Sequence, residues 1–163
     1  MTAKKHRACV MLGGNLGDVR ATFEQASEAL AAQGVVIERR SAVAASKAVD
    51  CLPGTPDFCD QALVIGWDDS PEALLDLLQR TEIAFGRPAV HRQDASRTLD
   101  CDLILFDAEQ RRTAKLTLPH PRARQRRFVL ELLLEVAPDW RFPDTGETVR
   151  EAYQKLPAPA ALS

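Results

Sequence analysis

The chain has 163 residues, of which 45% are hydrophobic and 27% charged, and its formal net charge is −2. This length suits one domain with a sizeable core, the composition excludes a disordered chain, and the balanced charge excludes a global field that attracts nucleic acid or membranes. No apolar run approaches the roughly 20 residues that span a bilayer, and the apolar stretch at 8–12 is too short for a signal-peptide core, so we expect a single cytoplasmic domain over residues 1–163.

The N-terminal part of the chain predicts strands separated by one helix and one loop. Residues 7–12 are apolar and indicate a short buried strand that ends in a Gly-Gly-Asn turn. Apolar residues recur at helical spacing over 18–33, and the following glycine ends that helix. Residues 35–49 are rich in β-branched side chains and predict one long strand, which leads into a loop with proline and glycine at 50–57. Another strand is predicted at 58–67.

The middle of the chain predicts a second helix and a second buried strand. Ser70 and Pro71 are typical of a helix start, and this helix is expected to continue to about Phe85. The polar segment 87–96 has no clear period and predicts a loop. Residues 100–106 then predict a strand that is apolar except for two acids.

The C-terminal region predicts further helices. Apolar spacing over 122–136 indicates one helix, and Thr148 with Glu151 forms a capping-box pattern that begins another. The Pro- and Ala-rich tail from about residue 157 is expected to be frayed. The order strand, helix, strand, strand, helix, strand predicts an α+β fold, a ferredoxin-like βαββαβ sandwich with extra C-terminal helices. Such a sheet packs helices on one face and can leave the other face free for ligands.

Two acids, Asp100 and Asp102, alternate with apolar residues in the predicted acidic strand. Side chains in a strand alternate between faces, so these carboxylates point to the same side, while Leu99, Cys101 and Leu103 face the other. Two carboxylates this close repel each other and resist losing water. Mg²⁺ bound to phosphates is the natural compensating cation. The alternative is a pair of solvent-facing acids on a half-exposed strand.

A basic cluster follows this strand and suits phosphate. It consists of Lys115, His120, Arg122, Arg124, Arg126 and Arg127. Arginine offers a planar fork to phosphate oxygens, and histidine can donate a hydrogen bond to one. For the arginines the alternative is a solvated helix face. Arg87 and Arg92 in the preceding loop are placed to fold over phosphates and exclude water, and Gln79 and Glu82 share one helix face.

These segments together resemble the 6-hydroxymethyl-7,8-dihydropterin pyrophosphokinase (HPPK) family. The resemblance rests on residues 12–17, 97–106, 116–120 and 126–130, and it continues to Phe142-Pro143-Asp144. It implies a transferase of folate biosynthesis that moves the β,γ-diphosphate of ATP to the pterin hydroxymethyl group and releases AMP. ATP is then the co-substrate, and Mg²⁺ the cofactor. Partners are expected to be small molecules only, and the protein a monomer or at most a weak dimer.

The resemblance also implies roles for individual residues. Asp100 and Asp102 match the acids that hold two Mg²⁺ ions, and Arg87 and Arg97 match the arginines that stabilise the transferring group. These two acids and two arginines are the expected catalytic residues. Expected ATP-binding residues are Gln79, Glu82, Lys115, Thr117, His120 and Arg126. Expected pterin-binding residues are Gly13, Phe58, Asp60 and Phe128, with the two aromatics stacking on the pterin.

The chain departs from the family pattern mainly on the pterin side. Asp60 stands where the family has asparagine, and an ionised carboxylate accepts hydrogen bonds but donates none. Asp94 stands where a loop tryptophan is usual, and segment 47–55 keeps only Pro53-Gly54 of the family's motif. One alternative is therefore a divergent paralogue that acts on a modified pterin or another alcohol. The other is a regulator that binds a nucleotide or pterin without turnover, against which the intact acid pair argues.

Overall fold

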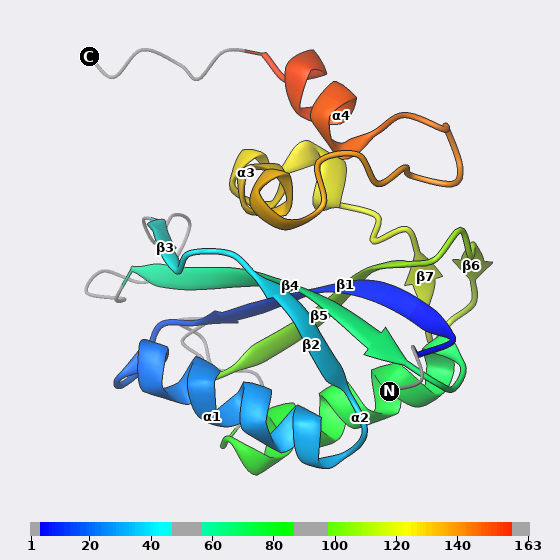
Figure 1. Ribbon diagram of the computed structural model, residues 1–163. Coiled ribbons are helices and arrows are strands. Elements are labelled where there is room, and N and C mark those ends of the chain that lie inside the picture. Colours follow the sequence, from blue (N-terminus) through cyan, green and yellow to red (C-terminus); the bar gives the residue numbers. More distant parts are fainter. Residues whose placement is uncertain (1–3, 47–56, 87–97, 158–163) are drawn as a thin grey trace, which may run out of the picture.

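The structure is a computed structural model that describes residues 4–46, 57–86 and 98–157 (Figure 1). Its strands are β1 (His6–Gly14), β2 (Val36–Arg40), β3 (Ala44–Ser46), β4 (Phe58–Trp67), β5 (Asp100–Phe106), β6 (Arg111–Arg112) and β7 (Thr117–Leu118). Its helices are α1 (Val19–Ala32), α2 (Pro71–Ala84), the short 3₁₀ helix η1 (Ala123–Gln125), α3 (Arg127–Val136) and α4 (Val149–Lys155). No helix in this described part of the chain is long and apolar enough to cross a membrane.

One antiparallel sheet forms the centre of the molecule, in the order β2-β4-β1-β5, and β3 pairs with the beginning of β4. β6 and β7 form a separate hairpin. Helices α1 and α2 cover one face of the sheet, and α3 and α4 lie over the other (Figure 1). We call these the lower face and the upper face, as they are drawn in Figure 1. The protein is therefore a mixed α/β molecule, and its upper face is partly covered, whereas the sequence suggested that this face could stay free.

Alternation along the strands sorts the apolar side chains into two cores. The lower core joins the sheet to α1 and α2 and includes Val10, Leu12, Phe23, Leu30, Leu63, Ile65, Leu78, Leu99, Cys101 and Leu103. The upper core joins the sheet to α3 and α4 and includes Met11, Ala62, Val64, Ile104, Leu130, Leu133, Phe142 and Val149. Each fully buried large apolar side chain contributes about 2 kcal/mol relative to exposure, so both helical layers are held by hydrophobic burial. The lower-face positions of Leu99, Cys101 and Leu103 confirm the predicted alternation of the acidic strand.

The predicted helix ends are confirmed where local capping residues mark them. Asp18 caps α1 by accepting a hydrogen bond from the Ala21 N–H at 3.2 Å. Ser70 caps α2 through the Ala73 N–H at 3.0 Å. At α4, Thr148 and Glu151 make both hydrogen bonds of the capping box. These bonds satisfy N–H groups that have no partner inside a helix.

The single strand predicted over 35–49 is wrong, because β2 and β3 are separated by residues 41–43. Ser41 is buried at this break. Its N–H donates to the Ala62 carbonyl at 2.9 Å, and its Oγ accepts from the Ala62 N–H at 2.8 Å. A serine side chain therefore replaces part of the ladder with β4 and lets the chain bend. Residues 47–49 of the predicted strand lie outside the described residues.

The helix predicted over 122–136 is also interrupted. Residues 123–125 form η1, Arg126 adopts extended backbone angles (φ −106°, ψ 107°), and α3 begins at Arg127. Between residues 122 and 127 only Ala123 is apolar, so a regular apolar spacing begins only at Phe128. The first five residues of the predicted helix therefore have no amphipathic face that would hold them in a continuous α-helix.

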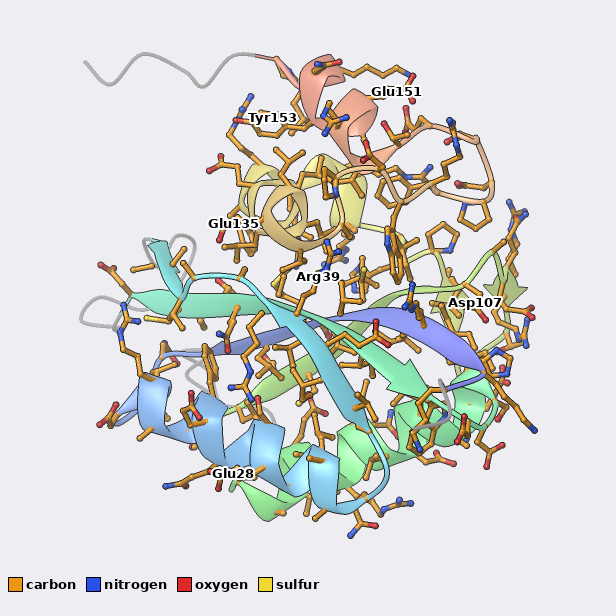
Figure 2. All side chains as sticks on the ribbon, in the orientation of Figure 1. Glu28, Arg39, Asp107, Glu135, Glu151 and Tyr153 are labelled. Atoms are coloured by element: carbon orange, nitrogen blue, oxygen red, sulfur yellow. The ribbon has the colours of Figure 1, made fainter. Side chains whose placement is uncertain are left out.

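Polar contacts tie α3 to the sheet edge that β2 and β3 form. Figure 2 shows Arg39 between the sheet and α3, where its Nη1 donates to the Val136 carbonyl at 3.2 Å. The Glu135 carboxylate accepts the Ala42 N–H at 2.9 Å. Within the C-terminal layer, the Arg127 guanidinium of α3 lies 5.1 Å from the centre of the Tyr153 ring of α4. The upper helical layer is thus anchored both to the sheet and within itself.

Candidate active site

Three carboxylates gather on the upper face around a glycine of β1. Gly13 pairs with Asp60 of β4 on one side and with Asp100 of β5 on the other, and Asp102 follows on β5 opposite Met11. Directly paired residues share a face, and so do alternate residues of one strand. Asp60 and Asp100 are half-buried and Asp102 is exposed. The acid pair therefore lies where the apolar cover of the upper face ends.

Gly13 leaves room for the side chain of Asp60. A Cβ atom at this glycine would stand 2.9 Å from the Asp60 Oδ1 atom and 3.9 Å from the Asp100 Cβ atom. Any larger residue at position 13 would push the Asp60 carboxyl aside. The glycine thus sets how close the carboxyl of β4 comes to the acids of β5.

The surroundings of Asp60 make its carboxyl easier to protonate than an ordinary aspartate. Burial, followed by the negative charges of Asp102 and Asp100, raises the pKa of Asp60 from 3.8 to about 6, and the positive charge of Arg126 opposes this shift. Like charges close together and removal from water both disfavour the ionised form. A cation arriving beside Asp100 and Asp102 would relieve this repulsion.

A bulge in β5 brings His120 to the acid strand. Val10 pairs with Leu103 and Cys9 with Leu105, so Ile104 is the extra residue of the bulge. Its carbonyl accepts the His120 N–H at 2.9 Å. Bulges commonly redirect the chain beside functional sites. Here the bulged residue, Ile104, binds the segment that follows β7, and it lies two residues after Asp102 in β5.

The His120 ring is arranged as a hydrogen-bond donor. Its Nδ1 accepts the Arg122 N–H at 3.2 Å, so the neutral ring carries its proton on Nε2. Burial lowers the pKa of His120, Asp102 raises it, and Arg126 and Arg122 lower it again. The ring is therefore neutral near pH 7 and can donate from Nε2 to an anion without first being charged.

The basic cluster of the sequence divides into two groups. Arg122 and Arg126 act on the charges of His120 or Asp60, and Arg126 lies where the chain enters α3. Arg124 instead pairs with Asp144 and stacks on Phe142 at 4.8 Å. Like Arg127, which stacks on Tyr153, it contributes to the packing of the C-terminal layer, a contact that neither the phosphate role nor the solvated helix face predicted.

The expected ATP-side residues outside this cluster lie along α2 and the β6–β7 hairpin. The Lys115 ammonium pairs with Asp76 of α2 at 2.8 Å, and Gln79 is exposed one helical turn beyond Asp76. Residues three apart on a helix are surface neighbours, so Gln79 lies next to the Asp76 side chain that Lys115 contacts. Thr117 is exposed in β7.

Glu82 behaves differently from Gln79, although both were expected on one face of α2. It is 5% exposed, and its Oε2 accepts the Cys101 N–H at 2.8 Å, between the two acids of β5. A sign of this was present in the sequence, because Glu82 continues the buried stripe of Leu74 and Leu78 at four-residue spacing. The bulge at Ile104, in contrast, could not be predicted from the alternation of polar and apolar residues in the acidic strand.

The two aromatics expected at the pterin lie on elements that meet on the upper face. Phe58 begins β4 two residues before Asp60, on the same face, and is half-buried. Phe128 is 36% exposed in the first turn of α3, a helix that packs on β4. Arg87, Arg92, Asp94 and Arg97 lie outside the described residues, as do segment 47–55 and the tail from 158.

The donor set fits Mg²⁺ that is shared with a phosphate ligand. Asp100 and Asp102 offer hard oxygen donors on one face of one strand, which Mg²⁺ prefers. Within residues 4–46, 57–86 and 98–157, no group of three or more His, Cys, Asp or Glu side chains is able to hold a metal. Mg²⁺ is typically bound by one or two carboxylates, with phosphates and water completing its shell. A triphosphate would supply those missing oxygens.

Comparisons with known proteins find one family model and several similar sequences. The family model described as 7,8-dihydro-6-hydroxymethylpterin-pyrophosphokinase (HPPK) matches residues 9–138. A 2-amino-4-hydroxy-6-hydroxymethyldihydropteridine pyrophosphokinase of Synechocystis sp. is 38% identical over 93% of this chain and 76% of its own. The protein of that name from Methylorubrum extorquens is 37% identical over 92% of this chain and 93% of its own.

A solved structure has the same fold at low sequence identity. The Plasmodium falciparum HPPK-DHPS chain solved with pteroate superposes with a TM-score of 0.67 at 11% identity, over 95% of this chain and 45% of that chain. The present chain thus spans less than half the length of that solved protein. At this identity the likeness concerns the fold alone.

Proposed function

The chain belongs to the 7,8-dihydro-6-hydroxymethylpterin-pyrophosphokinase family, and we propose that it performs the family's reaction at the upper-face carboxylates. The reaction transfers the β,γ-diphosphate of ATP to the hydroxymethyl group of 6-hydroxymethyl-7,8-dihydropterin, a step of folate biosynthesis, and releases AMP. The observation that carries the proposal is the placement of Asp100 and Asp102 on one open strand face, beside His120 and Arg126.

In this proposal, Asp100 and Asp102 would coordinate Mg²⁺. Asp100 and Asp102 are on the edge strand and present their carboxylates away from the lower core. These two residues would hold Mg²⁺, which would supply neutralisation of phosphate charge and activation of the attacking hydroxyl oxygen. The two carboxylates also position the triphosphate by accepting the metal on a rigid strand rather than on a loop.

The neighbouring donors orient the phosphates. His120 donates from Nε2 while remaining neutral, and Arg126 offers its guanidinium fork from the start of α3. Both groups stabilise negative charge as it shifts between the phosphoryl groups. Arg87 and Arg97 are proposed to complete this set, and Gln79, Lys115 and Thr117 to contact the nucleoside end.

The pterin is proposed to bind between Phe58 and Phe128, with its polar edge at Asp60 above Gly13. A flat heterocycle suits stacking on aromatic rings. When Asp60 is protonated, its carboxyl can donate one hydrogen bond and accept another, as an asparagine amide does. The pKa of Asp60, raised to about 6 in the metal-free protein, supports use of the protonated form as the pH falls toward 6.

The ionised form of Asp60 favours a second class of substrate. An ionised Asp60 only accepts hydrogen bonds, so it suits a modified pterin, or another alcohol, that offers donors at this edge. A panel of pterins assayed for AMP release separates the two candidates. Robust turnover of the standard pterin rules out the second.

Asp100→Asn and Asp102→Asn test the proposed site. Each change removes a negative metal ligand, so AMP release should fall at least 100-fold, which corresponds to about 3 kcal/mol of barrier. Asp139→Asn, an exposed change in the C-terminal layer, should leave AMP release unchanged. Near wild-type AMP release by either strand variant would remove the acid pair from the mechanism.

Further expectations are part of the proposal. We propose two Mg²⁺ ions, a single domain over residues 1–163 and a monomeric or weakly dimeric protein. We also propose the ferredoxin-like βαββαβ arrangement, which the sheet order β2-β4-β1-β5 supports.

A further inference from the structure

Glu82 is a buried carboxylate placed directly behind the acid strand. It lies in the last turn of α2, is 5% exposed, and accepts the Cys101 N–H at 2.8 Å through Oε2. Cys101 is the residue between Asp100 and Asp102, and its side chain belongs to the lower core that α2 also forms. The contact therefore reaches the backbone of the acid pair from the face opposite to their carboxylates.

Packing alone gives little reason for an acid at this position. Glu82 follows Leu74 and Leu78 on the buried stripe of α2, where a leucine would bury more apolar surface. Burial opposes the charged form of a carboxylate, and the C-terminal end of a helix carries partial negative charge that opposes it too. A residue that breaks the local rule in this way is expected where a polar contact has a functional use.

The hydrogen bond to Cys101 constrains the beginning of an edge strand. β5 has β1 on one side only in the described sheet, so N–H groups on its open side need other partners. Glu82 takes the one that lies between the two acids. The same contact joins α2 to β5, the elements on either side of segment 87–97. The direction of both carboxylates follows from the backbone angles that this bond holds.

We propose that Glu82 is a positioning residue, which acts through the Cys101 N–H to hold Asp100 and Asp102 in the geometry that Mg²⁺ requires. This role rests on the proposed function, because it assigns the metal to the acid pair. It differs from the ATP contact expected from the sequence, since Glu82 acts from behind the strand. Loss of a group that orients metal ligands typically weakens metal binding 10- to 100-fold.

Two substitutions of similar size isolate the hydrogen bond. Glu82→Gln keeps an oxygen that accepts the Cys101 N–H, whereas Glu82→Met fills the same space without an acceptor. Thr81→Val is the matched control, because it removes a buried hydrogen bond of the same helical turn, from Thr81 Oγ1 to the Leu77 carbonyl at 2.8 Å, without touching β5. The free energy of unfolding is measured for all three, so that general destabilisation is known.

The readouts are amide hydrogen exchange at Cys101 without ligands and calorimetric Mg²⁺ binding with a non-hydrolysable ATP analogue. In Glu82→Met, the amide hydrogen of Cys101 should exchange at least 10-fold faster than in wild type, and the affinity for Mg²⁺ should fall about 10-fold. Glu82→Gln and Thr81→Val should stay within about 2-fold of wild type in Mg²⁺ affinity. KM for the pterin should be unchanged in Glu82→Met.

Unchanged Mg²⁺ affinity in Glu82→Met, or an equal loss in Thr81→Val, would overturn the positioning role. If Glu82→Met does not fold, Glu82→Gln decides, because an approximately 10-fold weaker Mg²⁺ affinity in that variant would contradict a role that any acceptor can fill. Failure of the proposed function is visible separately. Asp102→Asn would then bind Mg²⁺ with the analogue as tightly as wild type, whatever the Glu82 variants do.

Discussion

At the scale of single residues, Asp60 connects the fold to the chemistry of the site. It is held over Gly13, faces the acids of β5 and has a pKa raised to about 6. In the unfolded chain an aspartate titrates near 3.8, so between about pH 4 and pH 6 the folded protein holds the extra proton. The stability contributed by this proton is complete below about pH 4 and is lost as the pH rises through 6.

Asp60→Asn should therefore stabilise the protein at pH 8 but not at pH 4. A shift of about two pKa units corresponds to at most about 3 kcal/mol, and partial exposure reduces the expected gain to on the order of 1 kcal/mol. Urea unfolding at the two pH values measures the difference. Asp57→Asn, a change at an exposed carboxyl just before β4, is the control. Equal effects of Asp60→Asn at both pH values would contradict the assignment of this proton.

The orientation of individual side chains could be predicted where it follows from the local sequence pattern. The common face of Asp100 and Asp102 followed from strand alternation. The contact of Glu82 with the backbone of β5, which the sequence did not predict, depends on how α2 packs against β5. This packing of α2 on β5 is a tertiary feature that local sequence does not determine. The one sign of it in the sequence is an acid in line with the leucines of α2.

At the scale of elements, the best-predicted boundaries are those that side chains cap. α4 shows this most completely, because Thr148 and Glu151 each accept the other's N–H at 3.0 Å. The break at Ser41 and the bulge at Ile104 were missed. Both depend on the partner strand, through Ala62 in one case and β1 in the other, and no local propensity records them.

Thr148→Ala should destabilise the protein by about 1 kcal/mol, because the first turn of α4 loses its cap. α4 packs on α3 through Val149 and Ala152 in the upper core, so the loss should appear in global unfolding. Urea unfolding measures it, with Thr148→Ser as the conservative control that keeps the hydroxyl. Equal stability of Thr148→Ala and wild type would show that the cap does not contribute.

At the scale of the whole molecule, the sheet separates two tasks. Its lower face is covered by α1 and α2, and α3 and α4 lie over its upper face (Figure 1). On that upper face Asp102 is exposed and Asp100 is half-buried. The order of elements made an antiparallel sheet with one helical layer predictable. The second layer was not, because the sequence shows that α3 has an apolar side but not which surface that side covers.

Ligand binding at this open end should stabilise the whole protein. Mg²⁺ with a non-hydrolysable ATP analogue at about 100 times its Kd adds about 2.7 kcal/mol, which is a rise of roughly 5–10 °C in Tm for a chain of this size. Thermal unfolding with and without Mg²⁺ measures it. In Asp102→Asn the Mg²⁺-dependent part of the rise should fall by more than half, and an undiminished rise would place the metal elsewhere.

The proposed reaction transfers a diphosphate, rather than a single phosphoryl group, from ATP to the pterin alcohol. ³¹P NMR of the wild-type protein with ATP, Mg²⁺ and 6-hydroxymethyl-7,8-dihydropterin tests it most directly. The predicted spectrum shows AMP and a pterin diphosphate ester growing in equal amounts as ATP disappears. Formation of ADP with a pterin monophosphate, or unchanged ATP under these conditions, would contradict the claim.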